Sequence, residues 1–253
     1  MSLSTVQRYF IKLSFDGSKF HGWQIQQNAN SVQSELNKAL AVLLRKGVET
    51  TGCGRTDTGV HAKVFYVHFD NDEIVDTGTL IHKLNAILPW EIAIDSIFPV
   101  QSDHHARFSA TARTYDYHIN RKKDPFLLGK SWYNIHLPDV DKLNRFVRII
   151  MEYNDFTAFS KSNTQTFTNN CKISKAVWEE KNDGSVVFTI QADRFLRNMV
   201  RAIVGTLIKA ADDDFTESDF RQIIESKNRS EAGVSVPAHG LYLTNVEYPF
   251  EVK

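Results

Sequence analysis

The chain has 253 residues, of which 42% are hydrophobic and 24% are charged, which is ordinary usage for a globular protein of one or two domains. Its apolar runs are only a few residues long, far short of the roughly 20 residues that a membrane-spanning helix needs. The two cysteines, Cys53 and Cys171, have no metal-ligand spacing and cannot form a disulfide framework. We therefore expect a cytoplasmic protein in a reducing compartment.

Positive and negative charges balance in total but not along the chain. There are 30 lysines and arginines and 30 acidic residues, and this neutral sum counts against a nucleic-acid-binding protein. Residues 101–132, however, contain six basic and three acidic residues, and residues 194–209 contain four basic residues and no acidic one. Such separation can form a surface that faces a polyanion, although solvated charged faces would give the same pattern.

The hydrophobic pattern predicts alternating strands and helices. In the first half, we expect a strand over 8–15, a helix over 31–46 capped by Ser31, a short strand near residue 48, a strand over 63–69, a helix over 79–88 and a strand over 92–98. In the second half, we expect a strand over 112–120, a helix over 139–153, a hairpin of strands 173–180 and 185–192, a helix over 195–211, a helix from the cap Thr216 to about 226, and a closing strand over 241–248.

Helices and tight hairpins together favour an α+β fold with a mixed or antiparallel sheet over a doubly wound parallel sheet. The two halves each resemble a unit of helices packed on a sheet. We place their boundary between about residues 99 and 113. Because no low-complexity linker separates them, we expect the halves to share one continuous sheet.

The most unusual segment is residues 52–62, which carries three glycines within eight residues around Asp57. Glycines let the backbone approach a ligand and adopt positive φ, so this loop can bring one carboxylate into a cleft. The segment lacks the Gly-Lys-Ser/Thr ending of a phosphate-binding loop and the glycine spacing of a dinucleotide-binding fold. A tight turn with a capping aspartate would explain the same residues.

Other catalytic chemistries find less support. The cysteines and histidines have no zinc-ligand spacing on any predicted element. A two-carboxylate glycosidase needs a second acid across the sugar, and the sequence alone pairs no such acid with Asp57. The Gly-x-Ser-x-Gly motif of a serine hydrolase is absent from the sequence.

Two further positions have both a structural and a functional interpretation. Arg197 and Arg201 are four residues apart on the predicted 195–211 helix, so they would share one face. Either this face is a solvated rim of the helix, or one of the two arginines turns into a cleft and pairs with a carboxylate. A nearby arginine lowers an aspartate pKa by about 1–3 units. Tyr115 lies in the middle of a predicted strand, between Arg113 and Tyr117 on the same face. It is either a side chain of the core or a surface on which an exposed base can stack.

Ordered motifs over almost the whole chain, from about residue 9 to 248, resemble the tRNA pseudouridine synthase A family. The central motif is Gly54-Arg55-Thr56-Asp57-Thr58-Gly59-Val60-His61-Ala62. The others, in order, are Phe15-Asp16-Gly17-Ser18 with Phe20-His21-Gly22-Trp23-Gln24, Ser31-Val32-Gln33, the block from His105 to Tyr115, Asn154-Asp155-Phe156-Thr157, Met199-Val200-Arg201 with Val204-Gly205, and Gly240-Leu241-Tyr242-Leu243.

The resemblance implies a fold, a reaction and a set of functional residues. The fold would be the α+β pseudouridine synthase fold, with two ferredoxin-like halves (residues 1–107 and 108–253) that share a mixed, mostly antiparallel sheet with a central cleft. The reaction would isomerise uridine to pseudouridine at positions 38, 39 and 40 of the tRNA anticodon stem-loop. The resemblance further implies a homodimer that needs no cofactor and no metal. It assigns the catalytic role to Asp57, a substrate contact to Tyr115, and the pairing cation to Arg201. Arg55 stands beside Asp57 in the sequence, so we expect it to contact the flipped nucleotide or its phosphate.

Three positions depart from the family pattern, and none of them is the aspartate itself. Thr58 stands where alanine is common, Val64-Phe65 replaces a frequent Gly-Gln, and Ile25 stands where an arginine often follows Trp-Gln. The missing cation at Ile25 bears on RNA affinity or site preference. Two competing hypotheses are a non-catalytic RNA-binding module and an aspartate-dependent hydrolase of a nucleoside or sugar.

Overall fold

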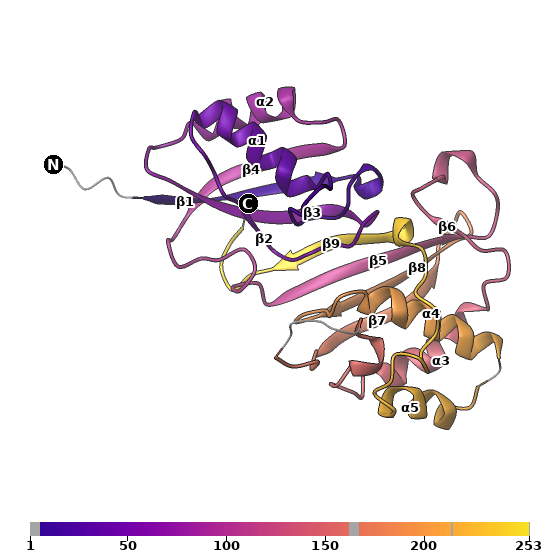
Figure 1. Ribbon diagram of the computed structural model, residues 1–253. Helices are drawn as coiled ribbons and strands as arrows, with labels where there is room; N and C mark the ends of the chain where they lie inside the picture. Colours follow the sequence, from indigo (N-terminus) through magenta and orange to yellow (C-terminus); the bar gives the residue numbers. More distant parts are fainter. Residues whose placement is uncertain (1–5, 162–166, 214, 253) are drawn as a thin grey trace. The chain divides into compact units, whose positions relative to one another are not determined.

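The computed structural model describes residues 6–161, 167–213 and 215–252, which form two compact units. Unit 1 contains the described residues up to Thr111 together with those from Leu243 onward, and unit 2 runs from Ala112 to Tyr242. The described residues contain five α-helices and nine strands in a mixed, mostly antiparallel arrangement, so the fold class is α+β as predicted (Figure 1). No helix in these ranges is long and apolar enough to span a bilayer.

Unit 1 is built on a central strand that pairs on both edges. Strand β1 (Gln7–Phe15) lies antiparallel between β3 (His61–Asn71) and β4 (Ile92–Val100). The short β2 (Thr51–Gly52) pairs with the other edge of β3. Helices α1 (Val32–Leu44) and α2 (Thr77–Ile87) lie together on one side of these strands (Figure 1).

The local sequence explains why these elements begin where they do. Ser31 caps α1 by accepting a hydrogen bond from the Ser34 amide at 3.2 Å, and Asp76 does the same for α2 through the Thr79 amide. In β1 the alternating residues Tyr9, Ile11, Leu13 and Phe15 are all buried, as the period of two predicts. Phe10 on the other face is also fully buried, where it contacts Tyr248 and Phe250 from the end of the chain.

Unit 2 is a second set of antiparallel strands with its own helices. Strand β8 (Ser185–Ala192) lies between β5 (Ala112–Asn120) and β7 (Ile173–Glu180), and the two-residue β6 (Trp132–Tyr133) runs parallel to β5. The helices are α3 (Val140–Ile150), α4 (Met199–Asp212) and α5 (Glu217–Glu225), with α3 packed on β7 and α4. Strand β9 (Leu241–Glu247) carries the chain from unit 2 back into unit 1.

One predicted helix starts later than expected. The pattern predicted a helix from residue 195, but α4 begins at Met199, because Asn198 has a left-handed backbone with φ of 66°. A left-handed residue cannot continue a right-handed helix. Arg197 therefore precedes the helix, and the expected shared helical face of Arg197 and Arg201 is wrong. The short polar strand expected near residue 48 lies at Thr51–Gly52.

Candidate active site

The loop that carries Asp57 connects β2 to β3 and is held by backbone hydrogen bonds at both ends. The Cys53 amide donates to the Tyr66 carbonyl at 2.7 Å, and the Gly59 amide donates to the Phe20 carbonyl at 3.3 Å. Within the loop, the Val60 amide donates to the Asp57 carbonyl at 3.1 Å. Asp57 is half-buried and Arg55 is exposed. This fixed backbone limits where the Asp57 carboxylate can go.

Two glycines allow the segment between β1 and α1 to lie directly against this loop. A Cβ on Gly17 would lie 2.0 Å from the Val60 carbonyl oxygen, and a Cβ on Gly22 would lie 2.2 Å from the Thr56 carbonyl oxygen. Gly22 also has a φ of +87°, which favours glycine. The backbone is thus in contact with the loop on both sides of Asp57.

A buried histidine anchors the point where the loop enters β3. His61 is 2% exposed, and its Nδ1 atom accepts a hydrogen bond from the Gly17 amide at 3.1 Å. The Asp16 Oδ1 atom lies 3.0 Å from the same nitrogen and also accepts from the Ser18 amide. Nδ1 can accept from Gly17 only when it carries no proton, so the first contact is made by an imidazole protonated at its other nitrogen.

A small pocket of about 230 Å³ lies beside the same loop. The residues lining it come from four segments of unit 1: Trp23, Gln24, Gln33, Thr50, Thr51, Gly52, Gly54, Arg55 and Arg107. Gln33 is nearly buried and organises the pocket, since its Oε1 atom accepts from the Gln24 side chain at 2.9 Å and its Nε2 atom donates to the Thr50 carbonyl at 2.7 Å. The pocket therefore has a fixed polar wall.

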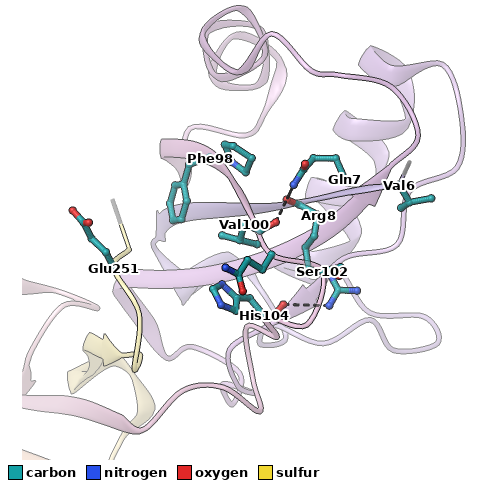
Figure 2. Close-up of a pocket in the computed structure, with 10 residues that line it drawn as sticks. Val6, Gln7, Arg8, Phe98, Val100, Ser102, His104 and Glu251 are labelled. Carbon is teal, nitrogen blue, oxygen red and sulfur yellow. Dashed lines mark hydrogen bonds between the residues drawn. The ribbon is translucent and has the colours of Figure 1, made fainter. Parts of the chain in front are cut away.

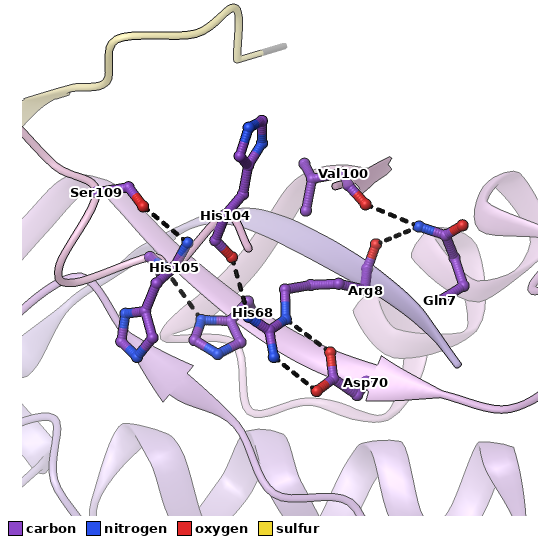
Figure 3. A network of polar contacts seen from close by, with 9 residues as sticks. Gln7, Arg8, His68, Asp70, Val100, His104, His105 and Ser109 are labelled. Atoms are coloured by element: carbon purple, nitrogen blue, oxygen red, sulfur yellow. Dashed lines mark hydrogen bonds and ion pairs between the residues drawn. The ribbon is translucent and has the colours of Figure 1, made fainter. Parts of the chain in front are cut away.

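Arg107 belongs to residues 104–109 of unit 1, and a polar network holds the backbone of this segment against neighbouring strands (Figure 3). The Ala106 amide donates to His68 Nδ1 at 3.1 Å, and the His105 amide donates to the Ser109 hydroxyl at 2.9 Å. Arg8 donates to the His104 carbonyl at 3.2 Å while it binds Asp70 with two hydrogen bonds of 2.7 and 2.8 Å. The network holds this segment on the strands β1 and β3.

Protonation of His68 is opposed by this environment. Burial, together with smaller effects of the nearby Arg8 and His105 charges, lowers the pKa of His68 from its ordinary value of 6.5 to about 4. Burial likewise lowers the pKa of His105. A neutral His68 is the form that can accept the hydrogen bond from Ala106, so the shift and the geometry agree.

A larger open pocket of about 630 Å³ lies on another part of unit 1 (Figure 2). Its lining includes Val6, Arg8, Phe98, His104 and Glu251. The Arg8 guanidinium there already binds the Asp70 carboxylate, so its charge is neutralised within the protein. This pocket is larger than the one beside Asp57 but offers an anion less positive charge.

The predicted residues Tyr115 and Arg201 lie in unit 2. Tyr115 is half-buried on β5, opposite Ile190 of β8, and its ring meets that of Phe195 edge to face at a centroid distance of 5.2 Å. Arg201 is in the first turn of α4, and its Nε atom donates to the Val236 carbonyl at 2.7 Å. The next carbonyl, of Pro237, accepts from the Tyr117 hydroxyl at 2.8 Å.

These contacts place Arg201 near the side of β5 that carries Tyr115 and Tyr117. Burial raises the pKa of Tyr117 strongly, and the nearby Arg201 charge opposes that shift. Tyr115 and Tyr117 are two residues apart on one strand, so their side chains share a face. Arg201 therefore lies near Tyr117, on the face of β5 that also carries Tyr115, while Asp57 and Arg55 share one loop of unit 1.

The sequence did not predict the pocket beside Asp57. Gln33 and Arg107 were noticed only as parts of motifs, because nothing in a sequence shows that residues 33, 54 and 107 meet. The one available signal was the Arg107-Phe108 pair within a basic stretch. In the ranges that the structure describes, no group of three or more histidine, cysteine or acidic side chains could hold a metal ion.

Comparison with known proteins identifies the class and then the family. A family model described as tRNA pseudouridine synthase matches residues 153–249. A tRNA pseudouridine synthase A from Bacteroides fragilis is 51% identical over 251 residues, which cover 98% of this chain and 99% of the relative. Proteins of the same name from Bacteroides thetaiotaomicron and Shewanella amazonensis are 49% and 38% identical, covering 98% and 96% of this chain and 93% of each relative.

The chain therefore belongs to the tRNA pseudouridine synthase A family, as the sequence motifs predicted. Among solved structures, an unknown protein from Galdieria sulphuraria is 11% identical, with a TM-score of 0.24 and coverage of 83% of this chain and 94% of that one. A score this low carries no information about the fold.

Proposed function

We propose that this protein isomerises uridine to pseudouridine in the anticodon stem-loop of tRNAs, at positions 38, 39 and 40, with Asp57 as the catalytic residue. Family membership supports the reaction. The observation that carries the role of Asp57 is its place on a short loop whose backbone is contacted from both sides by Gly17 and Gly22. Covalent or acid–base chemistry on a sugar requires a carboxylate in a fixed position, and a loop supported in this way favours such a position.

The reaction rearranges one nucleotide and neither gains nor loses an atom. The bond between ribose C1′ and uracil N1 breaks, the uracil turns, and a bond forms between C1′ and C5, while the proton on C5 leaves and N1 gains one. An ionised Asp57 acts either as a nucleophile at C1′ or as the base that removes the 2′ proton to give a glycal. Both routes are redox-neutral, and the proposed mechanism uses no cofactor and no metal.

Three other residues have proposed roles in substrate binding. The target base must leave its stack at a cost of a few kcal/mol, and Tyr115 compensates by packing against the extruded ring. Arg55 contacts the flipped nucleotide or its phosphate. Arg201 pairs with the Asp57 carboxylate, in the role that the family resemblance implies. We further propose that the protein is a cytoplasmic homodimer.

The assay that tests this proposal separates it from both competing hypotheses. Unmodified tRNA is incubated with the protein and digested, and the products are analysed for pseudouridine and free uracil. We expect pseudouridine from the wild type and at least about a 100-fold slower reaction from Asp57→Asn, with tRNA binding largely retained. Asp95→Asn is the control, since Asp95 is an exposed carboxylate of unit 1 paired with Lys12.

Each alternative result has a clear meaning. Free uracil would support a hydrolase, and binding without any product would support an RNA-binding module. Pseudouridine formed by Asp57→Asn at nearly the wild-type rate would show that another group does the chemistry.

A further inference from the structure

We propose that the pocket beside the Asp57 loop binds a backbone phosphate of the tRNA strand next to the target uridine, with Arg107 as a ligand together with Arg55, and that Phe108 stacks on a neighbouring unpaired base. This inference rests on the proposed function. It adds a phosphate site and a stacking residue to the substrate contacts above.

The charge of the pocket favours an anion. Arg55 and Arg107 come from segments 52 residues apart in the sequence and line the same 230 Å³ pocket. Among the described lining residues none is acidic, and the others offer amide, hydroxyl and backbone groups. Guanidinium groups bind phosphate oxygens with short, charge-assisted hydrogen bonds, often two at a time.

The size of the pocket favours one group on a longer strand. Pockets for whole small molecules usually measure about 300–1,000 Å³. A volume of about 230 Å³ is below that range and suits a single phosphate whose chain continues outside. A Cβ on the lining residue Gly54 would meet nothing within 4 Å, so the space over this glycine is open.

The pocket is built before any ligand arrives. Gln33 is held by three hydrogen bonds, to the Gln24 side chain, the Ile25 amide and the Thr50 carbonyl. Trp23 is 1% exposed and packs on Phe65 with ring centroids 4.5 Å apart. Rigid walls reduce the entropy that is lost on binding.

The neighbouring Phe108 is presented to solvent by a fixed backbone. Its side chain is 76% exposed, although the segment is anchored through His68, Ser109 and Arg8 (Figure 3). The Arg107 guanidinium lies 5.7 Å from the centroid of the Phe108 ring. An exposed aromatic ring beside a cation is the arrangement that binds single-stranded RNA, by stacking on a base and contacting the backbone.

The test measures the affinity of the full-length protein for an unmodified anticodon stem-loop RNA at several salt concentrations. For Arg107→Gln we expect about 5- to 20-fold weaker binding near 0.1 M salt. We also expect the slope of log affinity against log salt to become shallower by about 0.7–0.9, the value for one lost phosphate contact. Arg145→Gln is the matched control, because Arg145 is also exposed and lies 5.4 Å from the ring of the adjacent Phe146.

A second variant separates stacking from charge. Phe108→Ala removes the ring but no charge, so it should weaken binding by about 5- to 150-fold, the effect of losing one stacked base, without changing the salt slope. Thermal melting of each variant checks that it is folded. A reduced slope for Phe108→Ala, or an unchanged slope and affinity for Arg107→Gln, would overturn the inference.

The outcome can be read independently of the proposed function. If the wild type forms pseudouridine but Arg107→Gln binds RNA with the wild-type slope, the pocket is not a phosphate site and the reaction assignment stands. If the wild type binds the stem-loop and forms no pseudouridine, the proposed function fails, whatever the slopes are.

Discussion

At the scale of single residues, His68 couples the fold of unit 1 to pH. Its Nδ1 atom accepts the Ala106 amide, and it can do so only without a proton on that nitrogen. Its pKa is about 4 in the folded chain and near 6.5 when the chain is unfolded. The unfolded state therefore binds more protons between these two values, so the folded state is fully stabilised above about pH 6.5 and loses stability as the pH falls toward 4.

We expect His68→Asn to flatten this pH dependence, because an asparagine oxygen can accept the same amide and does not titrate. Each bound proton changes the free energy of unfolding by up to about 1.4 kcal/mol per pH unit in the window between pH 6.5 and 4. Urea unfolding at intervals from pH 8 to 4 measures the effect. Some dependence should remain, because the pKa of His105 is lowered too. Parallel curves for wild type and variant would exclude His68 as the source.

The sequence predicts a local structural feature when all of the residues that form it lie in one continuous motif. The glycine-rich loop around Asp57 was visible as a local pattern, and the structure has it as a half-buried, backbone-supported loop. The pocket formed with Gln33 and Arg107 was not predictable, because its residues meet only after three strands have paired. The assignments of Tyr115 and Arg201 remain predictions.

At the scale of elements, the Asp57 loop packs against the segment between β1 and α1, and this close packing is possible because Gly17 has no side chain. We expect Gly17→Ala to displace the loop, because the new Cβ would lie 2.0 Å from a backbone oxygen of Val60 that cannot rotate away. Overpacking of this kind costs about 1–3 kcal/mol.

Urea unfolding and the rate of pseudouridine formation test this together, and the rate should fall by at least about tenfold. Gly47→Ala is the matched control, since a Cβ there meets nothing within 4 Å. Equal stability and activity of Gly17→Ala and the wild type would mean that the loop tolerates the shift.

The ends of helices and strands were predicted correctly where a side chain in the sequence marks them. Thr216 caps α5 in a capping box with Asp219, and the expected hairpin strands end at the predicted residues. The start of α4 was missed, because the apolar spacing continues through Leu196 while the backbone of Asn198 turns left-handed. Hydrophobic periodicity carries no information about a single residue with positive φ.

At the scale of the whole molecule, we expect a dimer in solution, as the family resemblance implies. Light scattering on the purified protein should give about twice the chain mass of 28.9 kDa. The measurement belongs at several protein concentrations, because a weak dimer dissociates on dilution. A mass that stays at the monomer value at micromolar concentration would contradict this expectation.

The return of β9 to unit 1 has a consequence for synthesis on the ribosome. Unit 2 is continuous in the chain, but unit 1 also uses Leu243 and Val246, both buried, and Tyr248, whose hydroxyl donates to the Ala106 carbonyl at 2.6 Å. The first 111 residues emerge long before these partners exist. The unit that is translated first must therefore be completed last, which reverses the usual amino-to-carboxyl order of domain folding.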